Sequence, residues 1–205
     1  MAEAGRVITG VAGRIRLLAP GEGTRPISDK VKQSLFAALE AELDDPWAAP
    51  FLDLFAGSGA CGIEALSRGA TRAVLVEHDA GAARTIAENL RRTRLTGGTI
   101  VRQDVLRFLA AGAVDAGDAA GPFCVVVVDP PYARTALLAE TLGLLGDPSL
   151  RWLRDDALVI AKHFWKDAPP AVAGRLVAAR DRRFGETALR HYRLAPPVTP
   201  EVIAT

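Results

Sequence analysis

The chain of 205 residues is poor in the residues that most often bind metals or form disulfides, with two cysteines and three histidines. Cys61 and Cys124 are too few for a disulfide framework and both lie in apolar segments, which favours a reducing cytoplasm. The histidines, His78, His163 and His191, show neither an i, i+4 pair nor cysteine companions. We therefore expect no bound metal.

Long apolar runs and an excess of charge are also missing. No apolar stretch reaches the about 20 residues that a membrane-spanning helix needs, and Met1 to Arg6 lacks the apolar core of a signal peptide. We expect a soluble, cytoplasmic protein that does not bind membranes. The formal net charge of +1 excludes nucleic-acid binding through overall charge, so such a function would need a local basic patch.

Nothing in the sequence marks a boundary between two large domains, and the length suits one α/β domain. Residues 6–18 form two β-prone runs around a glycine, which predicts a hairpin with its arginines on one face. A Gly/Pro connector follows, and Ser28 is placed to cap a helix with apolar residues at a spacing of four. We predict an N-terminal extension over residues 1–26 and one domain over residues 27–205.

The most informative stretch covers residues 51–62 and has glycines at the spacing G-x-G-x-x-G. It predicts a buried strand containing Asp53, a tight turn through Gly57 and Gly59, and the start of a helix. Glycine permits positive φ and lets backbone amides approach a ligand, while a helix N-terminus favours a negative group. By itself this spacing also fits an NAD(P)-dependent oxidoreductase, since Glu77 lies where a ribose-binding acid is expected.

A second stretch, residues 125–132, reads as a buried strand that ends in Asp129, Pro130, Pro131 and Tyr132. A hydride-transferring enzyme has no use for this ending, but a methyltransferase acting on the exocyclic amine of a base does. Such an amine is a poor nucleophile until both of its N–H groups are bonded, and the Asp129 side chain and the Pro130 carbonyl can accept those bonds. The prolines keep these groups rigid, and Tyr132 can stack on a base.

Further strands and helices alternate along the chain, which predicts a mostly parallel sheet with ligands at the carboxyl ends of its strands. Strands are expected at 72–77, 99–102, 125–128 and 157–161, followed by an antiparallel pair at 176–179 and 188–194. Asp53, Glu77, Asp104 and Asp129 fall at or near strand ends. Asp104 fits an adenine-binding role and a helix-capping role equally well.

These motifs resemble a known family. Residues 53–59 together with 129–132 are similar to the S-adenosylmethionine (SAM) dependent amino-methyltransferases. Residues 24–36 resemble the RsmD-type guanine-N2 methyltransferases of small-subunit (16S) ribosomal RNA, in which an Arg-Pro-(Thr)-(Thr/Ser)-Asp-(Lys/Arg) segment leads into a helix ending Leu-Phe. Here Ile27 replaces the commoner threonine and Thr24 a commoner leucine. The similarity continues through residues 62–70, so it covers most of residues 6–145.

The resemblance implies a Rossmann-like class I SAM-dependent methyltransferase fold, with a mostly parallel seven-stranded sheet, an antiparallel last strand and an N-terminal β-hairpin. It implies a monomer that binds SAM and methylates one guanine in small-subunit rRNA or in the assembling small subunit. The cofactor-binding residues would be Asp53, Phe55, Gly57, Gly59, Glu77, His78, Asp104 and Val105. The catalytic residues would be Asp129, Pro130, Pro131 and Tyr132. The RNA contacts would be Arg14, Arg16, Arg25, Lys30 and Lys32, since residues 1–34 carry six basic residues against three acids.

Three alternatives stay open from the sequence. An adenine-N6 or cytosine-N4 methyltransferase could use the same Asp-Pro-Pro-Tyr geometry. An NAD(P)-dependent oxidoreductase is favoured only by the glycine spacing and Glu77, and the chain lacks a Tyr-x-x-x-Lys pair and a substrate domain. A non-catalytic RNA-binding assembly factor would not need residues 129–132 intact.

Overall fold

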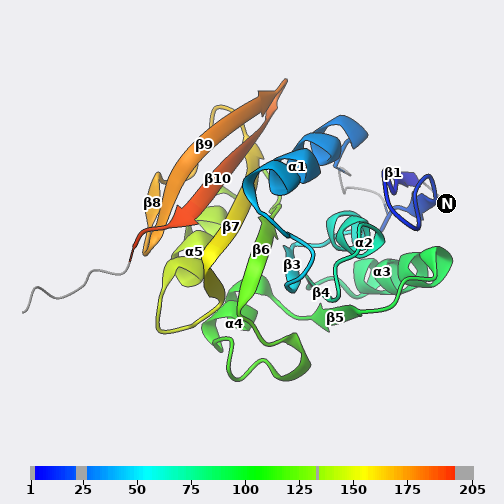
Figure 1. The fold of residues 1–205 in the computed structure, drawn as a ribbon, viewed down its shortest axis with the longest axis horizontal. Helices are drawn as coiled ribbons and strands as arrows, with labels where there is room; N and C mark the ends of the chain where they lie inside the picture. The colour runs from blue at the N-terminus through cyan, green and yellow to red at the C-terminus, as the bar shows by residue number, and fades with distance from the viewer. Residues whose placement is uncertain (1–2, 22–26, 133, 197–205) are drawn as a thin grey trace, which may run out of the picture.

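A computed structural model describes residues 3–21, 27–132 and 134–196, and its main element is an eight-stranded sheet (Figure 1). The strand order is β5-β4-β3-β6-β7-β10-β9-β8. In chain order these strands are β3 (Phe51–Leu54), β4 (Ala73–Glu77), β5 (Gly98–Arg102), β6 (Phe123–Val128), β7 (Leu153–Phe164), β8 (Val172–Ala173), β9 (Leu176–Phe184) and β10 (Thr187–Leu194). The five adjacent strands β5, β4, β3, β6 and β7 all run parallel to one another.

Helices cover both faces of the sheet because neighbouring residues on a strand point to opposite sides. Phe51 and Leu75 pack into one apolar cluster with α1 (Asp29–Glu42), α2 (Ala60–Ser67) and α3 (Ala80–Thr93). Leu52 and Val74, one residue away on the same strands, pack into a second cluster with α4 (Val105–Ala110) and α5 (Thr135–Gly146). The strands are thus buried on both faces, as the continuous apolar runs predict. A short 3₁₀ helix, Gly117–Ala119, precedes β6.

The antiparallel strands at the end of the chain match the predicted topology. β10 pairs antiparallel with β7 and with β9, so β10 runs opposite to the parallel strands. β9 extends to Phe184, beyond the expected end at residue 179, and the two-residue β8 adds an eighth strand to the predicted seven. A run of charged residues conceals this extension, because residues 180–183 read as Arg-Asp-Arg-Arg.

The N-terminal hairpin consists of β1 (Glu3–Arg6) and β2 (Arg16–Leu18), which pair antiparallel. It packs on α2 and α3, and Val7 and Leu17 are fully buried. Asn89 of α3 accepts from the Leu18 amide at 2.8 Å and donates to the Leu18 carbonyl at 3.0 Å. The hairpin therefore uses the core of the main domain, as its small size requires. The boundary predicted after residue 26 adjoins a segment outside the described residues and stays a prediction.

Helix α1 begins as predicted, with the Ser28 side chain accepting from the Val31 amide at 3.4 Å. The prediction that Lys32 contacts RNA is wrong, because this side chain is 1% exposed. Its ammonium lies 3.3 Å from the Glu64 carboxylate and donates to the Arg6 carbonyl at 2.5 Å. The helix period places Lys32 on the inner face of α1, where it joins the helix to the hairpin and to α2.

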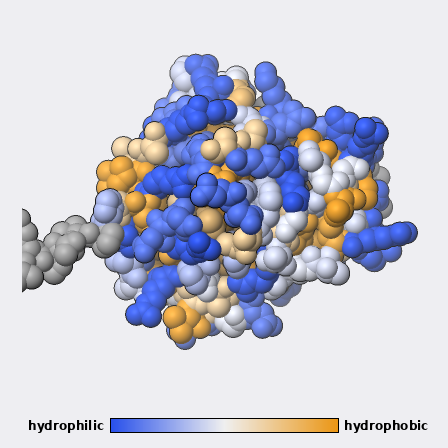
Figure 2. Space-filling view, viewed as in Figure 1, coloured by the Kyte–Doolittle hydropathy of each residue, from blue (hydrophilic) through white to orange (hydrophobic). Residues whose placement is uncertain are grey.

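The surface is mixed in character. Figure 2 shows hydrophilic residues over most of one face, with hydrophobic residues in separate groups. Within the described residues, no helix combines the length and the apolar character needed to cross a membrane.

Candidate active site

Asp53 and Gly62 join the first parallel strand to the helix that follows it. Asp53 is 2% exposed, and its Oδ2 accepts from the Gly62 amide at 2.8 Å. A side chain at Gly62 would place its Cβ 2.7 Å from Leu75 Cδ2, so any larger residue there would force the Leu75 side chain to shift. Burial raises the pKa of Asp53 to about 8, against the lowering effect of the Gly62 amide.

The turn between β3 and α2 has a backbone shaped for close approach of a ligand. Phe55 has φ +62°, a left-handed conformation that is uncommon for a side chain of this size, and Gly57 has φ +55°. Gly59 has φ +77° and is the residue from which α2 begins. Backbone strain of this kind concentrates at ligand sites. The structure therefore places Phe55, Gly57 and Gly59 together in one turn at the helix N-terminus.

Glu77, the last residue of β4, fixes this turn from the neighbouring strand. Its Oε2 accepts from the Gly57 amide at 2.9 Å, and its Oε1 accepts from the Asp79 amide at 2.9 Å. Each carboxylate oxygen has a second lone pair, so Glu77 can still accept hydroxyl groups of a ligand. The predicted His78 follows with an exposed ring, and its Nδ1 lies 3.0 Å from Glu77 Oε1.

Asp104 and Val105 lie at the carboxyl end of β5, next to β4 in the sheet. Asp104 is the N-cap of α4 and accepts from the Arg107 amide at 3.1 Å, which is the capping role considered for it. One carboxylate oxygen remains outside this bond. Val105 is 3% exposed and packs with the α4 cluster. Both residues are at the correct sheet edge, but the cap already explains Asp104.

Asp129 follows β6, whose parallel pairing with β3 brings it beside the glycine turn. The Asp129 amide donates to the Leu54 carbonyl at 3.3 Å. On the other side, Lys162 of β7 donates to Asp129 Oδ1 at 2.5 Å. Burial raises the pKa of Asp129 above its usual value, and the charge and the hydrogen bond of Lys162 oppose this rise. Burial lowers the pKa of Lys162, but the charge and the hydrogen bond of Asp129 together raise it above its usual value.

Tyr132 is held from two directions. Its hydroxyl is 2.7 Å from the Thr187 hydroxyl at the start of β10, and the Lys162 ammonium lies over its ring, 4.8 Å from the centroid. The Phe164 ring is next to it, with centroids 6.5 Å apart. The ring of Tyr132 is therefore fixed close to Asp129 by contacts with β7 and β10.

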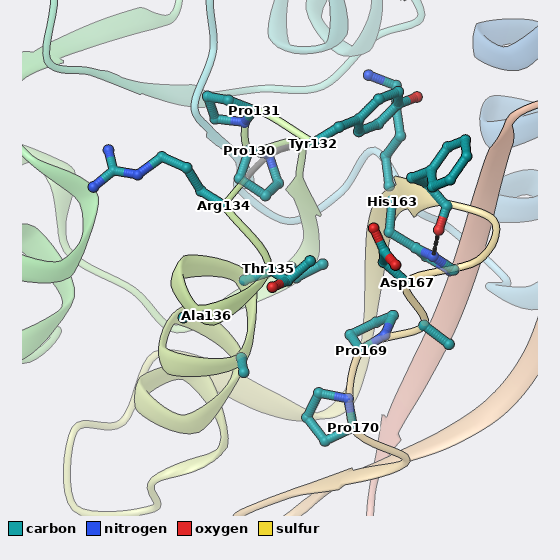
Figure 3. Close-up of a pocket in the computed structure, with 15 residues that line it drawn as sticks. Pro130, Pro131, Tyr132, Arg134, Thr135, Ala136, His163, Asp167, Pro169 and Pro170 are labelled. Atoms are coloured by element: carbon teal, nitrogen blue, oxygen red, sulfur yellow. Dashed lines mark hydrogen bonds between the residues drawn. The ribbon is translucent and has the colours of Figure 1, made fainter.

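A pocket of about 420 Å³ adjoins this motif on the α5 side of the sheet (Figure 3). Figure 3 shows Pro130, Pro131 and Tyr132 at one end of it and Pro169 and Pro170 at the other. None of the described residues that line it belongs to the glycine turn. The pocket thus lies on the Asp129–Tyr132 side of the site, apart from Asp53 and Glu77.

Of the residues predicted to contact RNA, Arg14, Arg16 and Lys30 are exposed. Arg25 lies outside the described residues, and Lys32 is buried, as given above. The role of the exposed three stays a prediction. Within the described part of the chain, no group of three or more His, Cys, Asp or Glu side chains is arranged to hold a metal ion.

Sequence reasoning missed Lys162 and Thr187, which both contact the Asp129–Tyr132 motif. Lys162 directly follows the apolar run 157–161, at the end of a predicted strand. This position would have suggested a contact with Asp129 only if β7 were known to lie beside β6 in the sheet. Thr187 carries no sequence signal, because it reaches Tyr132 through the antiparallel return of β10.

The strand order, the antiparallel β10 and the glycine turn after β3 define the class I SAM-dependent methyltransferase fold. An RNA methyltransferase of Salinibacter ruber, solved in complex with S-adenosyl-L-homocysteine, shares this fold with a TM-score of 0.59 and 16% identity, over 86% of this chain and 97% of that one. Residues 5–193 match the family model Conserved hypothetical protein 95, and the chain belongs to that family.

Two relatives are similar over most of their length. Ribosomal RNA small subunit methyltransferase D of Escherichia coli K12 is 35% identical over 181 residues, which is 88% of this chain and 85% of that protein. The solved structure of Thermus thermophilus protein TTHA0928 has a TM-score of 0.77 and 33% identity, and covers 92% of this chain and 99% of its own.

Proposed function

We propose that this protein is a monomeric, cytoplasmic, SAM-dependent methyltransferase that modifies the exocyclic N2 amine of one guanine in small-subunit rRNA. The observation that carries the proposal is the position of Asp129 and Tyr132, fixed at the carboxyl end of β6 beside the glycine turn of β3. The E. coli relative named ribosomal RNA small subunit methyltransferase D supports the same substrate class.

The residues at the ends of β3 and β4 fit SAM. Within the described residues, only one oxygen of the buried Asp53 carboxylate accepts a hydrogen bond, from Gly62. The second oxygen suits the ammonium group of the methionine part, and Glu77 suits the vicinal hydroxyls of the ribose. The left-handed backbone at Phe55 and Gly57 lets the turn approach the ligand. When bound, SAM supplies an electrophilic methyl group.

The residues around Asp129 act on the other reactant. Asp129 and the Pro130 carbonyl accept the two N–H bonds of the amine, which directs its lone pair toward the methyl group. Tyr132 stacks on the base and fixes its plane. Alignment of this kind supplies several kcal/mol of the barrier reduction. No strong base is required, because the amine becomes acidic only after methylation, and Asp129 is then close enough to take the proton.

RNA is a more suitable substrate than duplex DNA for a chain of this size. After the sheet and its helices are formed, few residues remain for a domain that reads the major groove. A folded RNA with an exposed base can be recognised through its phosphates and the base itself. Arg14 and Lys30 are exposed and available for phosphate contacts, and Arg16 is exposed as well.

The decisive experiment is methyl transfer from radiolabelled SAM to unmethylated small subunits and to naked small-subunit rRNA, followed by mapping of the label. We expect one labelled nucleotide, identified as N2-methylguanosine after digestion. Label in N6-methyladenosine or N4-methylcytidine would show that the target base is adenine or cytosine and not guanine. RNA binding without any labelled product would favour the assembly factor.

Thermal unfolding tests the cofactor independently of RNA. A ligand that binds only the folded state raises the unfolding temperature. We expect SAM and S-adenosylhomocysteine to raise it and NAD to leave it unchanged. A rise in unfolding temperature with NAD alone would favour an NAD(P)-dependent oxidoreductase over a methyltransferase.

A further inference from the structure

The charge next to Asp129 comes from the neighbouring strand. The parallel pairing of Val128 with Ala161 places the next two residues, Asp129 and Lys162, side by side. Their 2.5 Å contact is largely removed from water, with the Lys162 side chain 10% exposed and that of Asp129 20% exposed. Within the described residues, Lys162 is the one cation that forms an ion pair with Asp129.

The surroundings of this pair are acidic. Asp53 interacts electrostatically with both Asp129 and Glu77, and each of these carboxylates raises the pKa of Asp53. A buried carboxylate among others tends to hold its proton unless a cation is close. The other titratable groups near the pair are Cys61 of α2, Tyr132 after β6 and, through Cys61, Lys32 of α1. Of these two lysines, Lys32 is paired with Glu64, and Lys162 is paired with Asp129.

We propose that Lys162 is the positioning residue of the methyl-transfer site, which holds Asp129 ionised and turns one carboxylate oxygen toward the target amine. Because Lys162 occupies Oδ1, Oδ2 is left for the amine. An ionised carboxylate accepts hydrogen bonds through both oxygens, whereas a protonated one donates through one of them. The inference rests on the proposed function, since it assigns a role within that same site.

The same lysine orders Tyr132. Its ammonium lies 4.8 Å from the ring centroid, within the range of a cation–π contact. One face of the ring is then taken by the cation, and a base stacks on the opposite face. Lys162 thereby connects the group that binds the amine to the group that binds the ring.

The test compares Lys162→Met with Lys162→Arg, and uses Lys166→Met as a matched control. Lys166 is an exposed lysine four residues further on, whose ammonium lies over the Trp165 ring, so its replacement removes the same charge from the same region. For each protein we would measure thermal unfolding, SAM affinity, kcat on rRNA from pH 5 to 9.5, and the titration of Asp129 by carbon-13 NMR.

In Lys162→Met we expect kcat at pH 7 to fall by at least about tenfold and to recover as the pH rises. An opposite charge at this distance lowers a carboxyl pKa by roughly 1–3 units. Its loss should therefore move the acidic limb of the pH profile, which is the range where kcat falls as the pH is lowered, to a pH at least about one unit higher. The NMR titration of Asp129 should move with it. Lys162→Arg should keep the limb within about half a unit of wild type, and SAM affinity should change by less than about threefold in all three variants.

An unchanged pH profile and an unchanged Asp129 titration in Lys162→Met would overturn the proposal, as would an equal loss of kcat at every pH. A fall of more than about tenfold in SAM affinity would assign Lys162 to the cofactor instead. If Lys162→Met does not fold, Lys162→Gln replaces it as the uncharged variant. Its pH profile is then compared with that of Lys162→Arg. Wild-type protein without activity on rRNA would overturn the proposed function itself, which the wild-type profile shows before any variant is made.

Discussion

Lys32 of α1 and Glu64 of α2 form a buried ion pair, with 3.3 Å between the ammonium and a carboxylate oxygen and at most 1% of either side chain exposed. Glu64 also accepts from the Ile8 amide at 2.7 Å, the Thr9 amide at 3.0 Å and Arg68 Nε at 2.9 Å. One carboxylate therefore joins both helices to the N-terminal hairpin. The hairpin is fixed to the domain through buried charge and does not extend as a free arm.

We predict that Glu64→Gln destabilises the protein by about 3 kcal/mol, because it leaves the Lys32 ammonium buried without its counter-charge. Lys32→Met should cost less, since Glu64 keeps Arg68 and two amides. Denaturant unfolding measures both changes, and the double variant gives their coupling. The control is Glu88→Gln, whose partner Arg91 is 76% exposed, and which should have little effect. Equal, small effects of Glu64→Gln and Glu88→Gln would contradict this account of the hairpin.

The second prediction separates the two acids of the site. Asp129→Ala should abolish methyl transfer yet leave SAM affinity within a few-fold of wild type, because Asp129 is assigned to the amine. Glu77→Gln should weaken SAM binding for two reasons. It removes a carboxylate oxygen that would bind the ribose hydroxyls, and it disturbs the hydrogen bonds that Glu77 accepts from the Gly57 and Asp79 amides. Calorimetry with SAM and single-turnover kinetics on rRNA measure the two effects. If the effects were exchanged between the variants, the assignment of the acids would be wrong.

The third prediction concerns the pH dependence of stability through Asp53. Its folded-state pKa of about 8 lies above that of an unfolded aspartate, about 3.9. Between these values the unfolded state has lost a proton that the folded state keeps, so the free energy of unfolding falls as pH rises. This contribution is absent in Asp53→Asn. The stability of Asp53→Asn relative to wild type should therefore rise with pH, by up to about 1.4 kcal/mol per pH unit.

Denaturant unfolding of the two proteins at pH 5, 6.5 and 8 tests this, because other titrating groups cancel in the difference. SAM supplies a further check. If its ammonium binds Asp53, the carboxyl ionises on binding and releases a proton near pH 7, which calorimetry in buffers of different ionisation enthalpy detects. A stability difference that is flat with pH would contradict the raised pKa of Asp53.

The sequence predicted those parts of the fold and site that depend on local signals. The buried strand with Asp53, the glycine turn and the strand ending at Asp129 are continuous in the chain, and the alternation of strands and helices orders them at one sheet edge. The antiparallel β10 was also predicted. Lys162, by contrast, lies 33 residues after Asp129 and meets it only because β6 and β7 pair in the sheet. Such a contact depends on which strands are neighbours in the sheet, and hydrophobic periodicity along the chain does not specify that.

Lys32 shows the opposite failure. A lysine among other basic residues near the N-terminus suggested a nucleic-acid contact, and charge counting does not distinguish the inner from the outer face of a helix. Its true partner, Glu64, lies in another helix and could not be identified from spacing. The neighbouring Lys30, two positions earlier on α1, is exposed, so the same segment contains one structural lysine and one available for binding.

The last prediction follows from this distinction. Arg14 and Lys30 are exposed, and each phosphate contact that is lost should flatten the log–log salt dependence of RNA binding by about 0.7–0.9 units. The double variant Arg14→Ala/Lys30→Ala should therefore raise KM for rRNA and reduce the slope by about one to two units, while SAM affinity and stability stay near wild type.

Point variants are preferable to deletion of residues 1–19, because deletion would also remove the buried Val7 and Leu17 from the core. Arg154→Ala, at the amino end of β7 and therefore at the opposite edge of the sheet, is the control and should leave the slope unchanged. An unchanged slope in the double variant would mean that the hairpin serves packing alone, and the RNA surface would then be sought on β9 around Arg180, Arg182 and Arg183.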